Sequence, residues 1–343
     1  MTIIVLIVGI SLLILIHELG HFLAAKWSGL LVEEFGFGFP PKLFGKKIGE
    51  TTYTINALPF GGFVRIYGET RLEGEKENPT LKKRSFAHAP FINRVFIIVA
   101  GVIMNFLLGW LLLSLLFAVG TKSNAVVITS VMENTPAAEA NLQAEDILVG
   151  FKTGDELVSF IDQNKGQKAE LTIRRGGEEF LVTVTPRTEV PEGEGAVGFT
   201  FQETGFERLP LHRAIWEGLK TAGAIIGQVF TAIIALFTRL FTGGEVLKDF
   251  VGPVGIYRVA EAAASVGLFW LVNLIALISL NLAVLNIFPF PALDGGRLLF
   301  LIIEKIKGSP LSPKFENAVN ISGFLLLILL MVVITVKDIV GLF

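Results

Sequence analysis

Four long runs of apolar residues stand out in the pattern of hydrophobic and polar positions along the chain. They cover residues 1–25, 91–119, 266–292 and 318–338. A helix of about 20 apolar residues crosses the hydrocarbon core of a bilayer, which is roughly 30 Å thick. Each run is long enough, so the pattern predicts a polytopic α-helical membrane protein with about four transmembrane helices.

The first run has the length of a signal-peptide core, but two features predict that it is a retained span. No basic residues precede it, and no small-residue cleavage site follows it. The composition agrees with a membrane protein, because only 17% of the residues are charged, whereas soluble domains carry about 25%. A formal net charge of -2 without a basic stripe gives no reason to expect nucleic acid, so lipid and protein are the expected partners.

The loops differ in charge, which predicts the orientation of the spans. The cytoplasmic side attracts Lys and Arg, and these residues are frequent in the loop 26–90 and in the short loop after the third span. The basic residues are Lys42, Lys46, Lys47, Arg65, Arg71, Lys82, Lys83, Arg84, Arg297, Lys305, Lys307 and Lys314. The segment 120–207 is acidic on balance, so it is placed outside together with both termini.

Two loops are predicted to contain β-structure. Residues 50–67 contain two β-prone runs around Pro59-Phe60-Gly61-Gly62, which predicts a membrane-associated β-hairpin in the cytoplasmic loop. The segment 123–190 contains the alternating runs AVVITSVM, LVGF, AELTIRR and FLVTVTP, and a short helix can begin at Pro136. It is therefore predicted to be a small β-rich domain inserted between spans.

Residues 17–21 form an HExxH motif, His17-Glu18-Leu19-Gly20-His21, inside the first span. On a helix both imidazoles lie on one face, where they can share a metal ion, and Zn²⁺ suits neutral imidazoles. Three polar groups inside an apolar span are costly, so they indicate a functional site rather than a chance combination. Cysteine is absent, so any further metal ligand must be His, Asp or Glu.

A catalytic zinc needs a third protein ligand from elsewhere in the chain. The metzincin spacing is excluded, since Ala24 and Trp27 occupy the places of its glycine and third histidine. Asp294 and Glu304 are the leading carboxylates near a span end. Glu261 and Asp338 are further candidate ligands. His88 and His212 are predicted to be surface histidines.

Asp294 follows two prolines and precedes a glycine pair, in the run Asn286 to Gly296. This composition predicts a break in the third helix, with irregular backbone at membrane depth beside protein or a watery cavity. With four spans, the first and third helices both run inward and bring His17 and Asp294 to the cytoplasmic side.

A fifth apolar stretch, residues 213–241, would reverse that placement if it crossed the membrane. Charged residues interrupt this stretch at Arg213, Glu217, Lys220 and Arg239. We therefore predict that the region 208–262 forms amphipathic helices on the membrane surface.

The chain resembles the site-2 proteases, of the bacterial regulator-of-sigma-E kind. The resemblance is carried by HELGH in the first span, GVIMN (Gly101 to Asn105), GPVGI (Gly252 to Ile256) and NIFPFPALDGGR (residues 286–297). Within 123–190, ENTPAAEANLQAEDILVGF and TIRRGGEEFLVTVTP resemble a single PDZ domain, with Asn141 and Glu145 at places where glycine is usual.

The resemblance implies an intramembrane zinc metalloendopeptidase of the bacterial cytoplasmic membrane. It implies one Zn²⁺ per chain held by His17, His21 and Asp294, with Glu18 as general base for peptide hydrolysis. The implied substrates are transmembrane segments, such as those of anti-sigma factors or signal-peptide remnants. The active site would face the cytoplasmic side.

Substrate contacts are predicted at two places. Asn286 and Asn105 can hydrogen-bond a substrate backbone, although a contact between helices would explain either residue equally well. The hairpin, with Tyr53, Ile55, Gly61 and Gly62, can pair with an unwound substrate as an added strand, or it can simply pack the helices.

Two other classes of function compete with the protease. A membrane scaffold or chaperone would bind exported proteins through the PDZ-like domain and keep zinc for structure, but such a zinc normally has a fourth protein ligand, and none is evident. A transporter is disfavoured because no inverted repeat relates the pairs of spans. The sequence indicates neither the individual substrate nor the oligomeric state.

Overall fold

The computed structural model describes residues 2–69, 79–121, 125–151, 153–175, 178–190, 195–206, 208–242 and 252–340. The chain divides into two compact units. One unit combines Met1–Leu115 with Ile215–Phe343, and the other is Leu116–Ala214. Among the basic residues used above to predict the orientation of the spans, Arg71 lies outside the described ranges.

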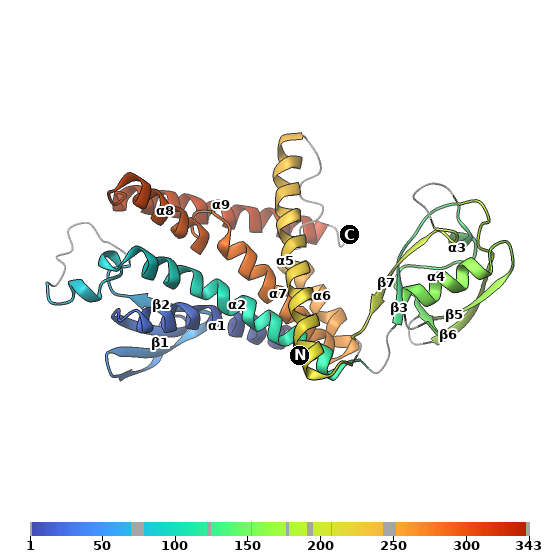
Figure 1. The fold of residues 1–343 in the computed structure, drawn as a ribbon, viewed down its shortest axis with the longest axis horizontal. Helices are drawn as coiled ribbons and strands as arrows, with labels where there is room; N and C mark the ends of the chain where they lie inside the picture. The colour runs from blue at the N-terminus through green and yellow to red at the C-terminus, as the bar shows by residue number, and fades with distance from the viewer. Residues whose placement is uncertain are drawn as a thin grey trace. The chain divides into compact units, whose positions relative to one another are not determined.

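Within the ranges just given, five helices of the first unit are long and apolar enough to cross a membrane (Figure 1). They are α1 (Thr2–Trp27), α2 (Phe91–Val119), α5 (Leu211–Thr242), α7 (Leu268–Ile287) and α9 (Pro313–Val340). Four of them fall on the four predicted spans. The region predicted to form surface helices contains α5 and the shorter α6 (Pro253–Val266), and α8 (Asp294–Lys307) precedes α9.

Glycines allow α1, α2 and α7 to pack at short range. A Cβ at Gly20 of α1 would collide with the backbone of Ala100 in α2, and one at Gly109 of α2 would lie 2.6 Å from Leu280 of α7. Close approach through small residues is a usual way for helices to associate in a membrane. The interface buries polar groups as well as apolar ones, including His17, His21, Asn105 and Ser279.

A small sheet of β1 (Val32–Ile48) and β2 (Thr51–Ile66) packs on α1. Its ladder has many register shifts, and Phe35 lies opposite both Tyr53 and Val64. On one side, residues 34–37 lie opposite residues 52–55, and the two segments run in the same direction. On the other side, residues 34–37 lie opposite residues 62–65, which run in the opposite direction. The two ends of β2 therefore flank the first half of β1.

The predicted hairpin is correct in one respect and wrong in another. The chain reverses between Asn56 and Gly62, as the Pro-Gly composition of that stretch predicts. The two runs around the reversal do not pair with each other, however, because residues 34–37 lie between them. The preceding residues Phe35 to Phe39 contain enough aromatic and β-prone character to compete for this pairing, which the prediction did not consider.

The second unit contains an antiparallel sheet of five strands in the order β6-β5-β4-β3-β7. Its elements are β3 (Ala125–Val131), α3 (Pro136–Glu139), β4 (Ile147–Val149), α4 (Gly154–Gln163), β5 (Ala169–Arg175), β6 (Glu178–Val184) and β7 (Phe199–Thr204). Its core includes Ile128, Leu148, Leu157, Leu171 and Ile173, all nearly inaccessible to solvent. The four predicted strands and the helix at Pro136 are present.

Two elements of this unit were not predicted. The helix α4 begins after Thr153, whose side chain accepts a hydrogen bond from the N–H of Glu156. This Thr-x-x-Glu arrangement is a helix-start pattern in the sequence. The strand β7 lies beyond the predicted end at 190 and pairs with β3, so the domain extends further than expected. Asn141 and Glu145 have φ of 56° and 72°, the left-handed region that favours glycine.

Candidate metal centre

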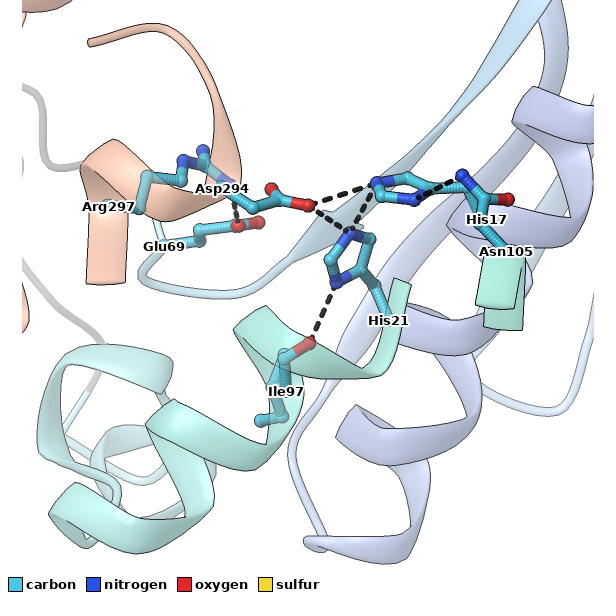
Figure 2. Close-up of polar contacts among 7 residues, drawn as sticks. All are labelled: His17, His21, Glu69, Ile97, Asn105, Asp294 and Arg297. Atoms are coloured by element: carbon cyan, nitrogen blue, oxygen red, sulfur yellow. Dashed lines mark hydrogen bonds and ion pairs between the residues drawn. The ribbon is translucent and has the colours of Figure 1, made fainter. Parts of the chain in front are cut away.

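The two histidines of the HExxH motif lie on the face of α1 that packs against α2. His17 and His21 are 7% and 8% exposed. The Nδ1 atom of His21 lies 2.7 Å from the carbonyl oxygen of Ile97, and the Nδ1 atom of His17 lies 3.3 Å from the Asn105 side-chain amide (Figure 2). Both rings are thus held from their Nδ1 side, and their Nε2 atoms approach each other to 3.1 Å.

The segment after α7 carries Asp294 to these rings. The helix α7 ends at Ile287, as the two prolines predict, and Asp294 is the first residue of α8. The segment turns at Ala292, whose φ is 73° and whose N–H donates to Asn320 Oδ1 at 3.1 Å. Gly295 and Gly296 are required because a Cβ at either would collide with carbonyl groups of this same segment.

The three predicted ligands meet at one point. Oδ2 of Asp294 lies 3.0 Å from Nε2 of His17 and 3.3 Å from Nε2 of His21. Zinc bonds of about 2.0–2.1 Å in tetrahedral geometry separate two ligand atoms by about 3.3 Å. The spacing of the three atoms therefore fits a shared zinc ion.

Two further observations favour an ion at this point. Asp294 Oδ2 is buried but accepts no hydrogen bond within the described residues, which is costly for a carboxylate unless a cation balances it. A Cβ at Gly101 of α2 would overlap His21 Nε2 and would lie 2.8 Å from His17 Nε2. Glycine at this position keeps open the space where an ion would sit.

Glu18 lies half-buried beside the three ligands. Its carboxyl group is close enough to His21, His17 and Asp294 to interact with them electrostatically. The sheet passes next to it, since a Cβ at Gly62 would lie 3.7 Å from Glu18 Cγ. A carboxylate in this place can exchange protons with a group bound at the ion.

The other candidate ligands have different partners. Glu304 accepts from Arg94 at 3.1 Å and from the N–H of Leu311 at 2.9 Å. Asp338 accepts from the N–H groups of Gly252 and Gly255, both at 2.9 Å. His88, His212 and Glu261 are exposed. Within the described ranges, His17, His21 and Asp294 form the one group of such residues close enough to share an ion.

The residues predicted to contact substrate are spread over several places. Asn105 is fully buried against His17, and Asn286 is half-buried one residue before the end of α7. Gly61 and Gly62 lie against α1, whereas Tyr53 packs its ring near Phe22 and Ile55 is 51% exposed. The Ile97 carbonyl could not be predicted from the sequence, because every residue has a backbone carbonyl and no residue type indicates which one contacts His21.

An ion pair borders the centre on the side of α8. Arg297, one turn after Asp294, donates to Glu69 at 2.6 Å (Figure 2). This contact ties the end of the β1–β2 segment to the helix that carries the carboxylate ligand. It can limit movement of Asp294 relative to α1.

Comparison with known proteins shows the family of this chain. Residues 5–330 match peptidase family M50. The chain belongs to peptidase family M50. It is therefore a zinc metallopeptidase and a membrane protein, and its cofactor is Zn²⁺.

Individual relatives cover nearly the full length of the chain. A protein of Clostridium perfringens (strain 13 / Type A), provisionally named zinc metalloprotease CPE1693, is 39% identical over 99% of both chains. Zinc metalloprotease RasP of Shouchella clausii (strain KSM-K16) is 31% identical over 100% of this chain and 99% of its own. Regulator of sigma-W protease RasP of Bacillus subtilis (strain 168) is 29% identical with the same coverage. The chain is similar to M50 peptidases from end to end.

Proposed function

We propose that this M50 peptidase cleaves peptide bonds within the transmembrane segments of other membrane proteins. The observation that carries the proposal is the meeting of His17, His21 and Asp294 with Glu18, on helices that are otherwise apolar. Ionisable groups are costly among apolar membrane helices, so their presence there indicates a functional site. A peptide bond that lies in the bilayer can reach this centre, whereas one in a folded soluble domain cannot.

In the proposed reaction, His17, His21 and Asp294 hold one zinc ion. Zinc, when bound, supplies an activated water and a Lewis acid for the scissile carbonyl. Glu18 takes the proton from the attacking water and then delivers it to the nitrogen of the leaving amine. Within the described residues this donor set has three members and no fourth, which is the number expected for a catalytic rather than a structural zinc.

The edge of the sheet is the proposed place of the substrate. A helical substrate hides its carbonyls in its own hydrogen bonds, so it must unwind before hydrolysis. The stretch 62–66 of β2 runs beside Glu18, and Gly62 carries no side chain that would block an extended backbone. An unwound segment can add to this edge as a further strand. Tyr53 fits this role less well, because its ring belongs to an aromatic cluster with Phe22 and Phe35.

The proposed topology has four crossings, with the termini and the second unit outside and the metal centre toward the cytoplasm of a bacterial cell. In Figure 1, α1 and α7 run toward the same end of the bundle, and α5 runs across that direction. A helix that lies across the others is suited to the membrane surface. The second unit is proposed to be a PDZ-like domain that selects substrates, and anti-sigma factors or signal-peptide remnants are the proposed targets.

Replacement of the base separates hydrolysis from metal binding. The variant Glu18→Gln is expected to keep one zinc per chain and to lose cleavage of a model transmembrane substrate in detergent or vesicles. Glu33→Gln, an exposed glutamate on β1, is the matched control and should cleave normally. Undiminished cleavage by Glu18→Gln would reject the assigned base.

A scaffold that keeps zinc for structure alone makes the opposite prediction. In that case neither the wild-type chain nor its variants would cleave any transmembrane substrate, and Glu18→Gln would behave as the wild type in every assay. Substrate trapping distinguishes the two, because a protease with an inactive base accumulates intact substrates in cells. Mass spectrometry of proteins that co-purify with Glu18→Gln would also show which membrane proteins are the natural targets.

A further inference from the structure

Asn105 lies at the centre of the buried interface between α1, α2 and α7. It is fully buried, and its side-chain Nδ2 lies 3.3 Å from His17 Nδ1 (Figure 2). Its backbone carbonyl accepts a hydrogen bond from Ser279 Oγ of α7 at 2.8 Å. Asn105 follows Gly101 by four residues, so both occupy the face of α2 that looks at the two histidines. Gly101 makes room for the ion, and Asn105 contacts a ring that faces it.

The hydrogen positions on the two rings follow from their surroundings. A backbone carbonyl can only accept, so His21 Nδ1 must carry the proton that it donates to Ile97 O at 2.7 Å. The Nε2 atom of His21 then has a free lone pair toward Asp294. His17 presents Nε2 to the same point, 3.0 Å from Asp294 Oδ2. If that Nε2 binds the ion, the proton of a neutral His17 ring must be on Nδ1, which needs an acceptor.

The amide nitrogen of Asn105 cannot be that acceptor. With Nδ2 toward His17, two N–H groups would face each other. Half a turn of the carboxamide exchanges Nδ2 and Oδ1, and the two orientations of the side chain occupy nearly the same space. In the present orientation Oδ1 is buried without a partner, so the turn breaks no hydrogen bond to the oxygen.

We propose that Asn105 is a positioning residue for the metal centre. Its Oδ1 accepts a hydrogen bond from His17 Nδ1–H, and this fixes the tautomer in which Nε2 is free to bind zinc. Asn105 thus does for His17 what the Ile97 carbonyl does for His21. Partners of this kind orient a histidine ligand and increase its basicity, and their loss typically weakens metal binding about 10–100-fold. The proposal rests on the proposed role of His17 as a zinc ligand.

Zinc affinity tests the proposal without reference to hydrolysis. Full-length variants are compared by competition with a chelator, on the monodisperse fraction from size exclusion in detergent. Asn105→Leu, which has no acceptor, is expected to bind zinc about 10–100-fold more weakly. Asn105→Asp has the same shape and accepts more strongly, so it is expected to keep affinity near that of the wild type. Ser279→Ala removes a hydroxyl that bonds the Asn105 backbone carbonyl and not its side chain, so this variant is the matched control and should bind zinc normally.

The outcomes separate the proposal from competing roles of Asn105. If Asn105 donates to His17 or only packs the helices, then Asn105→Asp loses zinc as strongly as Asn105→Leu does, or neither variant loses it. Either result overturns the proposal. His17→Ala is included as a reference: wild-type affinity in that variant would reject His17 as a ligand and with it the proposed function. Loss of zinc in His17→Ala but not in Asn105→Leu would overturn the role of Asn105 alone.

A measurement on the unmodified site covers the case in which a variant does not fold. The chain has four histidines, and the exposed His88 and His212 can be replaced by glutamine to leave two. Nitrogen-15 spectra of the zinc-loaded, histidine-labelled protein are expected to show protonated Nδ1 and metal-bound Nε2 in both remaining rings. A ring with protonated Nε2, or with zinc on Nδ1, would overturn the proposal.

Discussion

Each of the two units of the chain contains an aspartate with a buried carboxylate oxygen, and the partners of these two carboxylates differ. Asp146 in the second unit receives two hydrogen bonds of 2.6 Å from Arg175 and one of 2.8 Å from the N–H of Gln143. Oδ2 of Asp294 in the first unit lies between two imidazoles, and the described residues give it no partner besides these two rings. Burial alone therefore does not mark a functional carboxylate. An incomplete set of partners, with room for a cation, does.

The difference extends to the surroundings of the two carboxylates. Arg175 supplies a fixed positive charge, so Asp146 is neutralised within the protein itself. At Asp294, the backbone of α2 contributes a glycine instead of a side chain, and the space beside the imidazoles stays open. The first arrangement suits a structural ion pair, and the second one leaves room for an ion.

The largest effect is expected from closing that space. Gly101→Ala places a methyl group against His21 Nε2 and His17 Nε2, so zinc binding and cleavage should fall by about 100-fold or more. Zinc content by elemental analysis and cleavage of a transmembrane substrate measure the two effects. Gly223→Ala in α5, where a Cβ would meet nothing within 4 Å, is the matched control. Full zinc occupancy in Gly101→Ala would show that the space is not the ion site.

Breaking the second carboxylate site should leave the metal untouched. Asp146→Asn removes the charge that Arg175 pairs with, and the second unit should lose about 2 kcal/mol of stability. This value is below the usual cost of breaking a buried pair, because the Arg175 side chain is 35% exposed and can turn to water. Denaturant unfolding of the full chain, read by proteolysis within residues 125–204, measures the loss. A fall in the zinc content of Asp146→Asn would show that the Asp146 site is not independent of the metal centre.

The contacts of Asp146 also predict that the stability of the second unit depends on pH. Burial acts to raise the pKa of the Asp146 carboxyl, but the hydrogen bonds from Arg175 and from Gln143 N–H outweigh it, so the pKa lies below its ordinary value. The unfolded chain then binds more protons than the folded one, and stability falls as the pH drops below about 3.9. Pepsin digestion from about pH 5 to about pH 2 should show this loss in the wild type. The loss should be smaller in Asp146→Asn than in the control Asp155→Asn, and equal losses would contradict the assignment.

The smallest effect is expected at a third carboxylate, Asp338, whose partners are also complete. It accepts from the N–H groups of Gly252 and Gly255 and so caps α6. Asp338→Ala should lower stability by about 1 kcal/mol, the usual cost of a lost helix cap. Thermal unfolding in detergent measures the change, with the exposed Glu261→Ala as control. Zinc content should stay at the wild-type value in both variants.

Much of the site could be predicted from the sequence because its parts are local patterns. The HExxH spacing places His17 and His21 on one helix face, and the two prolines before Asp294 break α7 where the structure breaks it. That Asp294, rather than Glu304, meets the histidines depends on long-range packing. Glu304 is instead held by Arg94, 210 positions away in the sequence, and no local pattern indicates such a contact.

The parts of the fold that were missed depend on competition between segments. Residues 34–37 lie between the two ends of β2, which would pair directly with each other in a simple hairpin. The strand β7 joins β3 across more than 60 residues, although its alternation of Phe199 and Phe201 with polar residues is a usable strand signal. The role of Asn105 was open between substrate contact and helix packing, because the sequence does not show that its neighbour is His17.

The central claim is that His17, His21 and Asp294 share a single zinc ion. X-ray absorption at the zinc edge of the purified full-length chain tests this claim most directly. If these three residues share one zinc ion, the spectrum should show two imidazole nitrogens and oxygen donors at about 2.0–2.1 Å, and it should be lost in a variant that combines His17→Ala with His21→Ala. A zinc with fewer than two imidazoles, or an unchanged spectrum in that double variant, would contradict it.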